Sequence, residues 1–303
     1  MKATPRGLWS CSPLSLRVFV LAMLLLSAVG LGWLGMRAYR NYFVIRDVER
    51  LGGMVVTREA VPPWIRQWVG SRRIRLIEDV EGIRLNLSST VTDADLKCLS
   101  SVTELGWLEL NGNSRLTGCG MEHIQRLKGL QMLVLDGTPI TDTGIAHLTG
   151  LTNLGTLSLI DTGVTDTGLA QLGALTHLTC LELSSTNITG SGFKDLKGLT
   201  NLEVLDLQET ALTDEALAHL EAFPRLWHLA VASPQISDAG LAHLKRMSNL
   251  RTLGLVKTQV TDTGITELQG LTALRTLSLH DTRVTDEGIA NLQRALPALE
   301  VRK

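Results

Sequence analysis

Leucines recur at a fixed spacing along most of the chain. From Leu133 onwards a leucine returns every 24 residues, and a second apolar series follows two positions behind the first. The two series are Leu133, Leu157, Leu181, Leu205, Leu229, Leu253 and Leu277, then Leu135, Leu159, Leu183, Leu207, Val231, Leu255 and Leu279. Residues two apart lie on one face of a strand, so each repeat is predicted to add one short strand to a parallel sheet.

A helix start follows each predicted strand, and the whole unit reads LxxLxxLxLxxTxVTDxGLxxL. In the segment at Thr165, the threonine hydroxyl can accept a free backbone N–H as an N-cap. Asp166 then lies at the positive end of the helix dipole, and Gly168 is expected to let neighbouring helices approach closely. Units around Leu85 and Leu108 fit with one-residue changes in length, which gives nine units and a partial strand at 299–301.

A further threonine stands three residues after the strand in most units. Its members are Thr138, Thr162, Thr186, Thr210, Thr258 and Thr282. It falls where the chain must turn out of the sheet, and we expect its hydroxyl to bond a backbone group of a neighbouring turn.

This unit resembles the leucine-rich-repeat family over residues 83–301, with Thr in place of the usual Asn or Cys after the strand. The VTDxGL segment is similar to the repeats of F-box adaptor proteins and of large bacterial repeat arrays. The resemblance implies an α/β solenoid: a right-handed horseshoe with a parallel concave sheet and convex helices that binds other macromolecules. No F-box-like helical domain precedes the repeats, which disfavours an adaptor role in protein turnover.

An uncharged apolar segment, residues 18–36, precedes the repeats and follows a basic tail of residues 1–17. Nineteen residues of helix just span a hydrocarbon core, so we expect a single-pass transmembrane helix. A cleaved signal peptide is the alternative, because 28–30 reads Ala-Val-Gly. The short tail has no acidic residue and is expected to stay inside, which favours a solenoid outside the cytoplasm.

Residues 37–80 are predicted to form a linker and N-terminal cap, and 81–303 the solenoid. A helix is expected to leave the membrane and end at Gly52-Gly53, with a strand at 54–56. Pro62-Pro63 then precedes a short amphipathic helix that contains Trp64 and Trp68. A solenoid needs such an atypical terminal unit to cover the core of its first repeat.

Charge and cysteine content exclude several functions. The net charge is −1, so no strong field attracts the chain to nucleic acid. Cys11, Cys98, Cys119 and Cys180 share no CxxC spacing, so we expect four unpaired thiols and no zinc or redox motif.

Two sets of residues have side chains and spacings that could serve catalysis or metal binding. Glu182 and Asp206 occupy the same strand position in adjacent units, where paired carboxylates could serve a glycosidase or hold a cation. Small neighbours build no pocket there, so an exposed acidic patch is favoured. The histidines that share one helix position, His123, His147, His219 and His243, lack further metal ligands. We therefore expect no enzyme, cofactor or metal.

The concave strand face is the remaining candidate. Its N-terminal part carries bulk and acid, whereas its C-terminal part carries mostly Ala, Gly, Ser and Thr. Bulky anchors beside charge suit protein recognition, and the acids favour a basic partner. The candidate residues are Trp107, Glu109, Met132, Val134, Asp136, Glu182, Asp206 and His228. The predicted function is a membrane-anchored recognition or scaffolding protein; a secreted repeat protein and a cytoplasm-facing adaptor are the alternatives.

Overall fold

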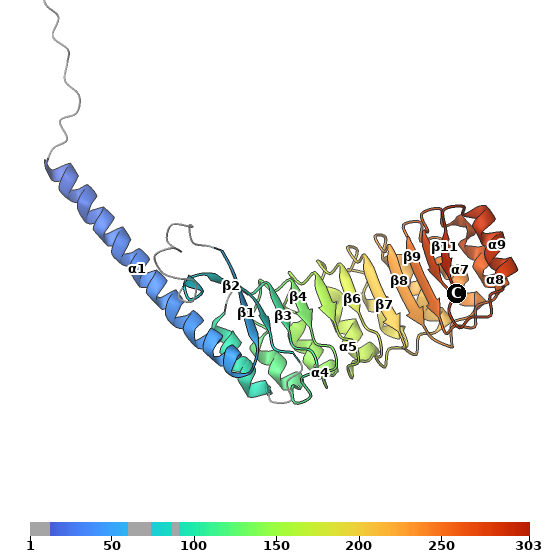
Figure 1. Cartoon of the computed structure of the whole chain (residues 1–303), viewed down its shortest axis with the longest axis horizontal. Helices are drawn as coiled ribbons and strands as arrows, with labels where there is room; N and C mark the ends of the chain where they lie inside the picture. Colours follow the sequence, from blue (N-terminus) through green and yellow to red (C-terminus); the bar gives the residue numbers. More distant parts are fainter. Residues whose placement is uncertain (1–12, 60–73, 87–90, 103) are drawn as a thin grey trace, which may run out of the picture. The chain divides into compact units, whose positions relative to one another are not determined.

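The computed structural model describes four stretches of the chain, and for residues 13–31 their backbone alone. These stretches are residues 13–59, 74–86, 91–102 and 104–303 (Figure 1). The chain forms two compact units, which are described separately. The first comprises Met1–Phe43 with Glu59–Asp79, and the second Val44–Arg58 with Val80–Lys303.

Helix α1 (Pro13–Arg50) is continuous through the end of the predicted span and the start of the linker. In the first unit one side of α1 is held by Asn41, whose Nδ2 donates to the carbonyls of Leu76 (2.9 Å) and Glu78 (2.8 Å). Arg37 forms an ion pair with Asp79 on the same side. The buried Asn41 amide is thus hydrogen-bonded, as burial requires.

The predicted end of this helix is confirmed. Gly52 has φ of +78°, a left-handed conformation that favours glycine, and the Gly53 N–H donates to the Val48 carbonyl at 2.9 Å. Val44 and Val48 on the last turns of α1 are buried in the second unit.

The predicted membrane span and cap helix fall mainly outside what the structure describes. Side chains before residue 32 are not described, and the segment with Trp64 and Trp68 is outside the described residues. Within the described part of the chain, no helix combines the length and the apolar character that crossing a bilayer requires.

The second unit is a solenoid built on one sheet whose eleven described strands follow sequence order, and β2 to β11 pair in parallel (Figure 1). The strands are β1 (Met54–Arg58), β2 (Asp79–Arg84), β3 (Trp107–Glu109), β4 (Met132–Val134), β5 (Thr156–Ser158), β6 (Cys180–Glu182), β7 (Val204–Gln208), β8 (His228–Ala232), β9 (Thr252–Val256), β10 (Thr276–Ser278) and β11 (Glu300–Arg302). Leu133 pairs with Leu157 and Leu157 with Leu181, so the 24-residue ladder is confirmed.

Strands β2 to β10 are each followed by one or two helical turns. These turns are η1 (Asp93–Ser101), η2 (Gly118–His123), α4 (Asp142–Ile145), η3 (Ala146–Leu148), α5 (Asp166–Gln171), η4 (Leu172–Ala174), η5 (Ser191–Asp195), α6 (Asp214–Leu217), η6 (Ala218–Ala222), α7 (Asp238–Leu244), α8 (Asp262–Ile265), η7 (Thr266–Gly270) and α9 (Asp286–Ala295). The nine predicted units and the final strand are all present in the described residues. The leucines of both series are fully buried between the sheet and the helical turns, and Phe193 packs edge-to-face on Phe223 at 6.5 Å between ring centres.

The threonine after each strand bonds its own unit, so the predicted contact with a neighbouring turn is wrong. Thr162 Oγ1 donates to the Leu159 carbonyl at 2.7 Å, three residues back. The residue at the same position of an earlier unit, Asn113, reaches further, because its amide donates to Leu110 in its own unit and to Leu85 in the preceding one.

The aspartate of each helix start bonds the following repeat, a contact that the sequence analysis did not foresee. The carboxylate of Asp238 accepts from the backbone N–H (2.8 Å) and the hydroxyl (2.6 Å) of Thr261. The same arrangement, here named the Asp–Thr ladder, links Asp93–Thr117, Asp142–Thr165, Asp166–Thr189, Asp214–Ser237, Asp238–Thr261 and Asp262–Thr285.

The ladder also coincides with N-capping, except at Thr189, where Gly190 precedes η5 and no side-chain cap bond forms. Thr165, which has an aspartate partner, caps its helix by accepting the Thr167 N–H at 3.2 Å. Gly118 and Gly190 stand where the aspartate would be, and the threonines that follow them, Thr141 and Thr213, make no side-chain cap bond. A hydroxyl that donates to the carboxylate has its lone pairs free for the helix, so the aspartate orients the cap.

Candidate recognition surface on the strand face

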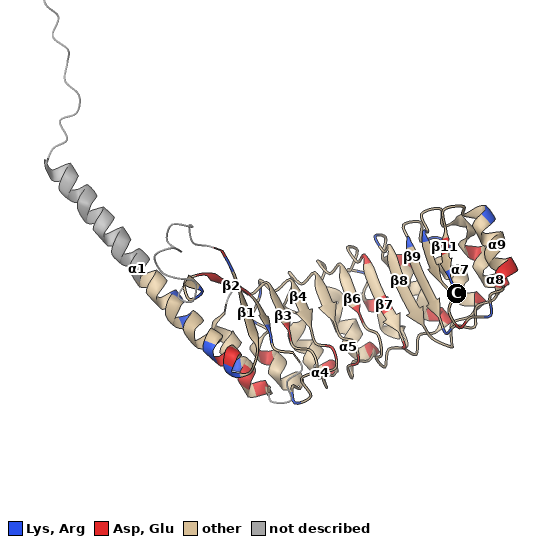
Figure 2. Cartoon of the chain, in the orientation of Figure 1, with Lys and Arg blue, Asp and Glu red and all other residues tan. Residues whose placement is uncertain are grey.

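All eight candidate residues lie on the outward side of the sheet, here named the strand face, and each is half-buried. The structure brings them together as two groups. Trp107 pairs in register with Met132 and Glu109 with Val134, and Asp136 follows at the end of the same strand. Glu182, Asp206 and His228 form the second group on β6, β7 and β8, and β5 separates the groups. Figure 2 shows that charge is sparse on the strands between them.

The first group is organised by Arg84 of β2, a residue that the sequence analysis missed. Its guanidinium binds both carboxylate oxygens of Glu109, at 2.5 and 2.9 Å, and lies 5.9 Å from the centre of the Trp107 ring. The hydrogen bond from Arg84 holds the pKa of Glu109 below its usual range. Glu109 is therefore neutralised within the chain and adds little to an acidic surface.

Trp107 also has a structural role on the strand face. Its indole ring lies across Gly82 of the preceding strand, where a Cβ atom would be only 1.8 Å from the ring. The tryptophan is held flat between this glycine and Arg84, which explains why it is half-buried. The repeat register was the sequence signal for these contacts, because it places Gly82 beside Trp107 and Arg84 beside Glu109.

Two carboxylates of the candidate set are held by internal donors. Asp136 accepts from the Ser158 hydroxyl (2.6 Å) and the Ile160 N–H (3.1 Å). Asp206 accepts from the Ser184 hydroxyl (2.7 Å) and from the Gln208 side-chain amide (3.1 Å). These bonds fix the carboxylates in orientation and cover part of each, which leaves fewer lone pairs for a partner.

Glu182 differs from the other acids because its carboxylate makes no hydrogen bond or ion pair with another residue that the structure describes, and only its backbone carbonyl accepts a bond, from the Leu159 N–H at 2.9 Å. It stands beside Asp206 in register, and Cys180 lies two positions before it on β6. Burial, together with the negative charges of Glu182 and Asp206, raises the pKa of the Cys180 thiol to about 11. The centre of the strand face is thus an acidic region in which Glu182 has the free carboxylate.

The cysteines behave as predicted where the structure describes them. Cys98, Cys119 and Cys180 are free thiols, and Cys11 lies outside the described residues. Burial raises the pKa of Cys98 to about 11 as well, so this thiol is unreactive at neutral pH.

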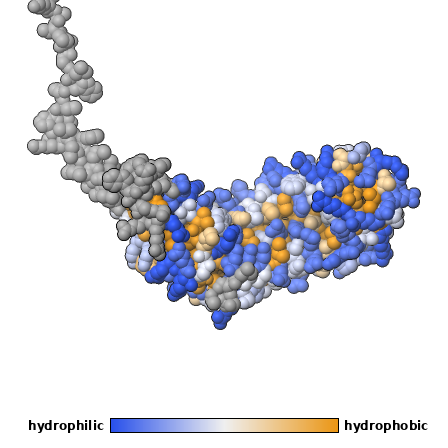
Figure 3. Space-filling view, viewed as in Figure 1, coloured by the Kyte–Doolittle hydropathy of each residue, from blue (hydrophilic) through white to orange (hydrophobic). Residues whose placement is uncertain are grey.

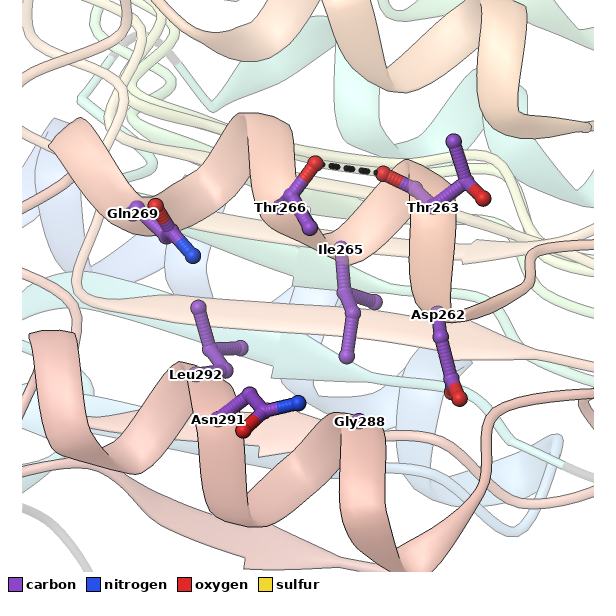
Figure 4. Close-up of a pocket in the computed structure, with 8 residues that line it drawn as sticks. All are labelled: Asp262, Thr263, Ile265, Thr266, Gln269, Gly288, Asn291 and Leu292. Atoms are coloured by element: carbon purple, nitrogen blue, oxygen red, sulfur yellow. Dashed lines mark hydrogen bonds between the residues drawn. The ribbon is translucent and has the colours of Figure 1, made fainter.

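A hollow of about 250 Å³ lies between α8 and α9 and is lined in part by Ile265, Leu292, Gln269 and Asn291 (Figure 4). Its carboxylate, Asp262, is engaged by Thr285 through the ladder. Among the described residues, no three His, Cys, Asp or Glu side chains gather as metal ligands.

The geometry defines a class of protein: a solenoid in which each unit adds one parallel strand and one helical turn to a layered leucine core. The family profile described as Leucine Rich repeat matches residues 174–196, which is one repeat of this array. The chain is therefore a leucine-rich-repeat protein.

Solved structures share this fold. An internalin, InlF, from Listeria monocytogenes superposes with a TM-score of 0.56 at 22% identity, and the match covers 73% of this chain and 66% of the internalin. TLR13 in complex with ssRNA13 gives a TM-score of 0.52 at 23% identity, over 71% of this chain and 30% of TLR13. A comparison with curated proteins finds no match. At these identities the likeness concerns the fold.

Proposed function

We propose that the chain recognises another protein through the strand face of its repeats, as the concave side of a right-handed horseshoe. The observation that carries this proposal is the open row of half-buried outward residues on consecutive strands, with an acidic centre at Glu182 and Asp206. Figure 3 supports it, because hydrophobic residues form broken patches among hydrophilic ones along the repeat array. Such mixed surfaces suit specific contacts between proteins.

A basic segment is the partner chemistry that we propose for this surface. Glu109 is neutralised by Arg84, so the attraction comes from Glu182 and, in part, from Asp206. These carboxylates would repel nucleic-acid phosphates, and we therefore infer a protein partner, although the TLR13 structure holds RNA.

The membrane anchor remains part of the proposal. The uncharged run of residues 18–36 and the continuous backbone helix α1 support it, and the basic tail supports a solenoid outside the cytoplasm. Retention of the intact chain in membranes after an alkaline wash is expected, and sequencing of the mature N-terminus separates an anchor from a cleaved signal. A reporter enzyme that is active only outside the cytoplasm, fused after Lys303, should be active.

The test of the recognition surface uses the full chain and a partner identified by cross-linking from the strand face. The double change Glu182→Gln with Asp206→Asn is expected to weaken binding about tenfold or more and to reduce its dependence on salt. The matched control is Glu267→Gln with Glu287→Gln, two exposed acids of the helix side. Equal binding by the strand-face variant, together with a loss in the control, would refute the assignment.

A further inference from the structure

Large apolar side chains are exposed along one side of α1 within the first unit. Trp33, Met36 and Tyr39, here named the aromatic strip, are 59%, 69% and 67% exposed. Their spacing of three residues places them along one side of the helix. With Leu34 and Tyr42 they account for five of the seven large hydrophobic residues that are exposed in the described part of the chain.

The remaining side of this helix is occupied by contacts of its own unit. Asn41 donates to the carbonyls of Leu76 and Glu78, and Arg37 pairs with Asp79. Trp33 meets this side only through the Arg37 guanidinium, 5.1 Å from the centre of its ring, and Tyr39 packs edge-to-face on Phe43 at 4.7 Å, yet both side chains stay more than half exposed. Three large side chains in succession with more than half of their surface in water mark a surface that a partner covers.

We propose that the aromatic strip lies in the headgroup layer of a phospholipid bilayer. This inference rests on the proposed anchor, because the uncharged run of residues 18–36 leads into the strip along the same helix. Trp and Tyr combine an apolar ring with a polar N–H or O–H, and such rings concentrate at the boundary between lipid and water. Exposed Arg40, next to Tyr39, supplies a cation for lipid phosphates.

The length of the strip agrees with this location. Tyr39 lies six positions after Trp33, which corresponds to about 9 Å along a helix. The headgroup region adds roughly 5–8 Å on each side of the hydrocarbon core. The strip is thus about as long as the layer is thick, and the water-exposed part of the chain begins close to Asn41.

Depth measurements on the full chain in phosphatidylcholine vesicles test this inference. The four native cysteines are replaced by serine, and one cysteine at a time is introduced as Met36→Cys, Tyr39→Cys or Arg46→Cys and labelled with an environment-sensitive fluorophore. Arg46 is the matched control, because it is exposed on nearly the same side of α1 two turns beyond Tyr39.

The labels at positions 36 and 39 should shift to shorter emission wavelengths. Lipids with a quencher near the headgroup should quench them at least twofold more than lipids with a quencher near the chain ends. The label at 46 should report water. Labels at 36 and 39 that report water like that at 46, or are quenched most from the bilayer centre, would overturn the inference.

Flotation of the same samples separates this outcome from failure of the anchor. Vesicles that keep the chain after an alkaline wash while the labels at 36 and 39 report water would refute the aromatic strip alone. Loss of the chain from the vesicles would refute the anchor and the strip together. A shift that occurs without lipid and grows with protein concentration would assign the strip to a second copy of the chain instead.

Discussion

The Asp238 carboxylate occupies the space beside Gly264, so no larger residue fits at position 264 while the carboxylate stays in place. A Cβ atom on Gly264 would lie 2.2 Å from Asp238 Oδ1, so Gly264→Ala forces this carboxylate away from Thr261. The chain itself contains the alternative combination, because Gly190 stands in the aspartate position and Ala216 in the glycine position of the next unit. A Cβ on Gly190 would lie 2.3 Å from the Ala216 Cβ. We therefore predict that Asp238→Gly and Gly264→Ala are strongly coupled.

The magnitude follows from the two hydrogen bonds that Asp238 accepts from Thr261, at 2.8 and 2.6 Å. Hydrogen bonds to a charged group contribute about 1.5–3 kcal/mol each, and partial exposure favours the lower value. Each single substitution loses both bonds and is expected to cost about 2–4 kcal/mol, with about 1 kcal/mol recovered in Gly264→Ala from the better helix former. The double variant loses the bonds once, so its cost should be at least about 2 kcal/mol below the sum.

Urea unfolding of the full chain and its three variants, followed by circular dichroism, measures this coupling. Gly270→Ala is the matched control, because a Cβ there meets no atom within 4 Å, and its effect should stay below about 1 kcal/mol. If the loss of unfolding free energy in the double variant equals the sum of the two single losses within about 0.5 kcal/mol, the carboxylate does not occupy the space above Gly264 and the reasoning fails.

Three further predictions concern charge and backbone. Burial would raise the pKa of Asp166, but hydrogen bonds from the following repeat outweigh it and hold this pKa below its usual value. The stabilisation from Asp166 is therefore complete above the unfolded pKa of about 4 and is lost as the pH falls through the folded pKa. The urea midpoint of the Asp166→Asn variant should accordingly fall less steeply below about pH 4 than that of the unchanged chain. Asp161 has φ of +54°, so Asp161→Gly should raise the free energy of unfolding by about 0.5–1 kcal/mol and Asp161→Val should lower it. The rate of Cys180 alkylation should rise with pH around a pKa of about 11, and the double change Glu182→Gln with Asp206→Asn should lower that pKa. An unchanged pH dependence would show that the two carboxylates do not act on the thiol.

The repeat could be predicted from the sequence because its signal is the core itself. Leucines two and 24 residues apart determine the strand, its inward face and its register, and the structure has Leu133, Leu157 and Leu181 paired as expected. The caps were predicted less well, since the role of a threonine such as Thr141 depends on the residue 23 positions earlier. That residue is Gly118, and the cap bond is absent. The regular interval from each aspartate to the next threonine was visible in the sequence. That it reflects hydrogen bonds between neighbouring units became clear only from the way the units stack.

The candidate surface was predicted in location but not in charge. Strand alternation placed Glu109 and Glu182 outward, and both are on the strand face. Treating them as equivalent acids was the error, because Arg84 belongs to the irregular first unit and its register with Glu109 became clear only from the pairing of β2 with β3. Irregular end units carry the least periodic information, and here one of them supplies the group that neutralises a candidate site.

The packing that determines this fold constrains the inward residues of each unit and leaves the outward ones, which a partner would contact, free to vary. Inward positions, turns and the Asp–Thr ladder are constrained by stacking, and they therefore recur from unit to unit. Outward positions such as Cys180, Val204 and His228 occupy one row of the strand face and share no chemistry, because the sheet accepts any side chain there. Departures from the repeat on this row therefore carry the information about binding. Among the described residues of the strand face, the Glu182 carboxylate beside Asp206 is a departure that no hydrogen bond or ion pair compensates, and we propose that recognition centres there.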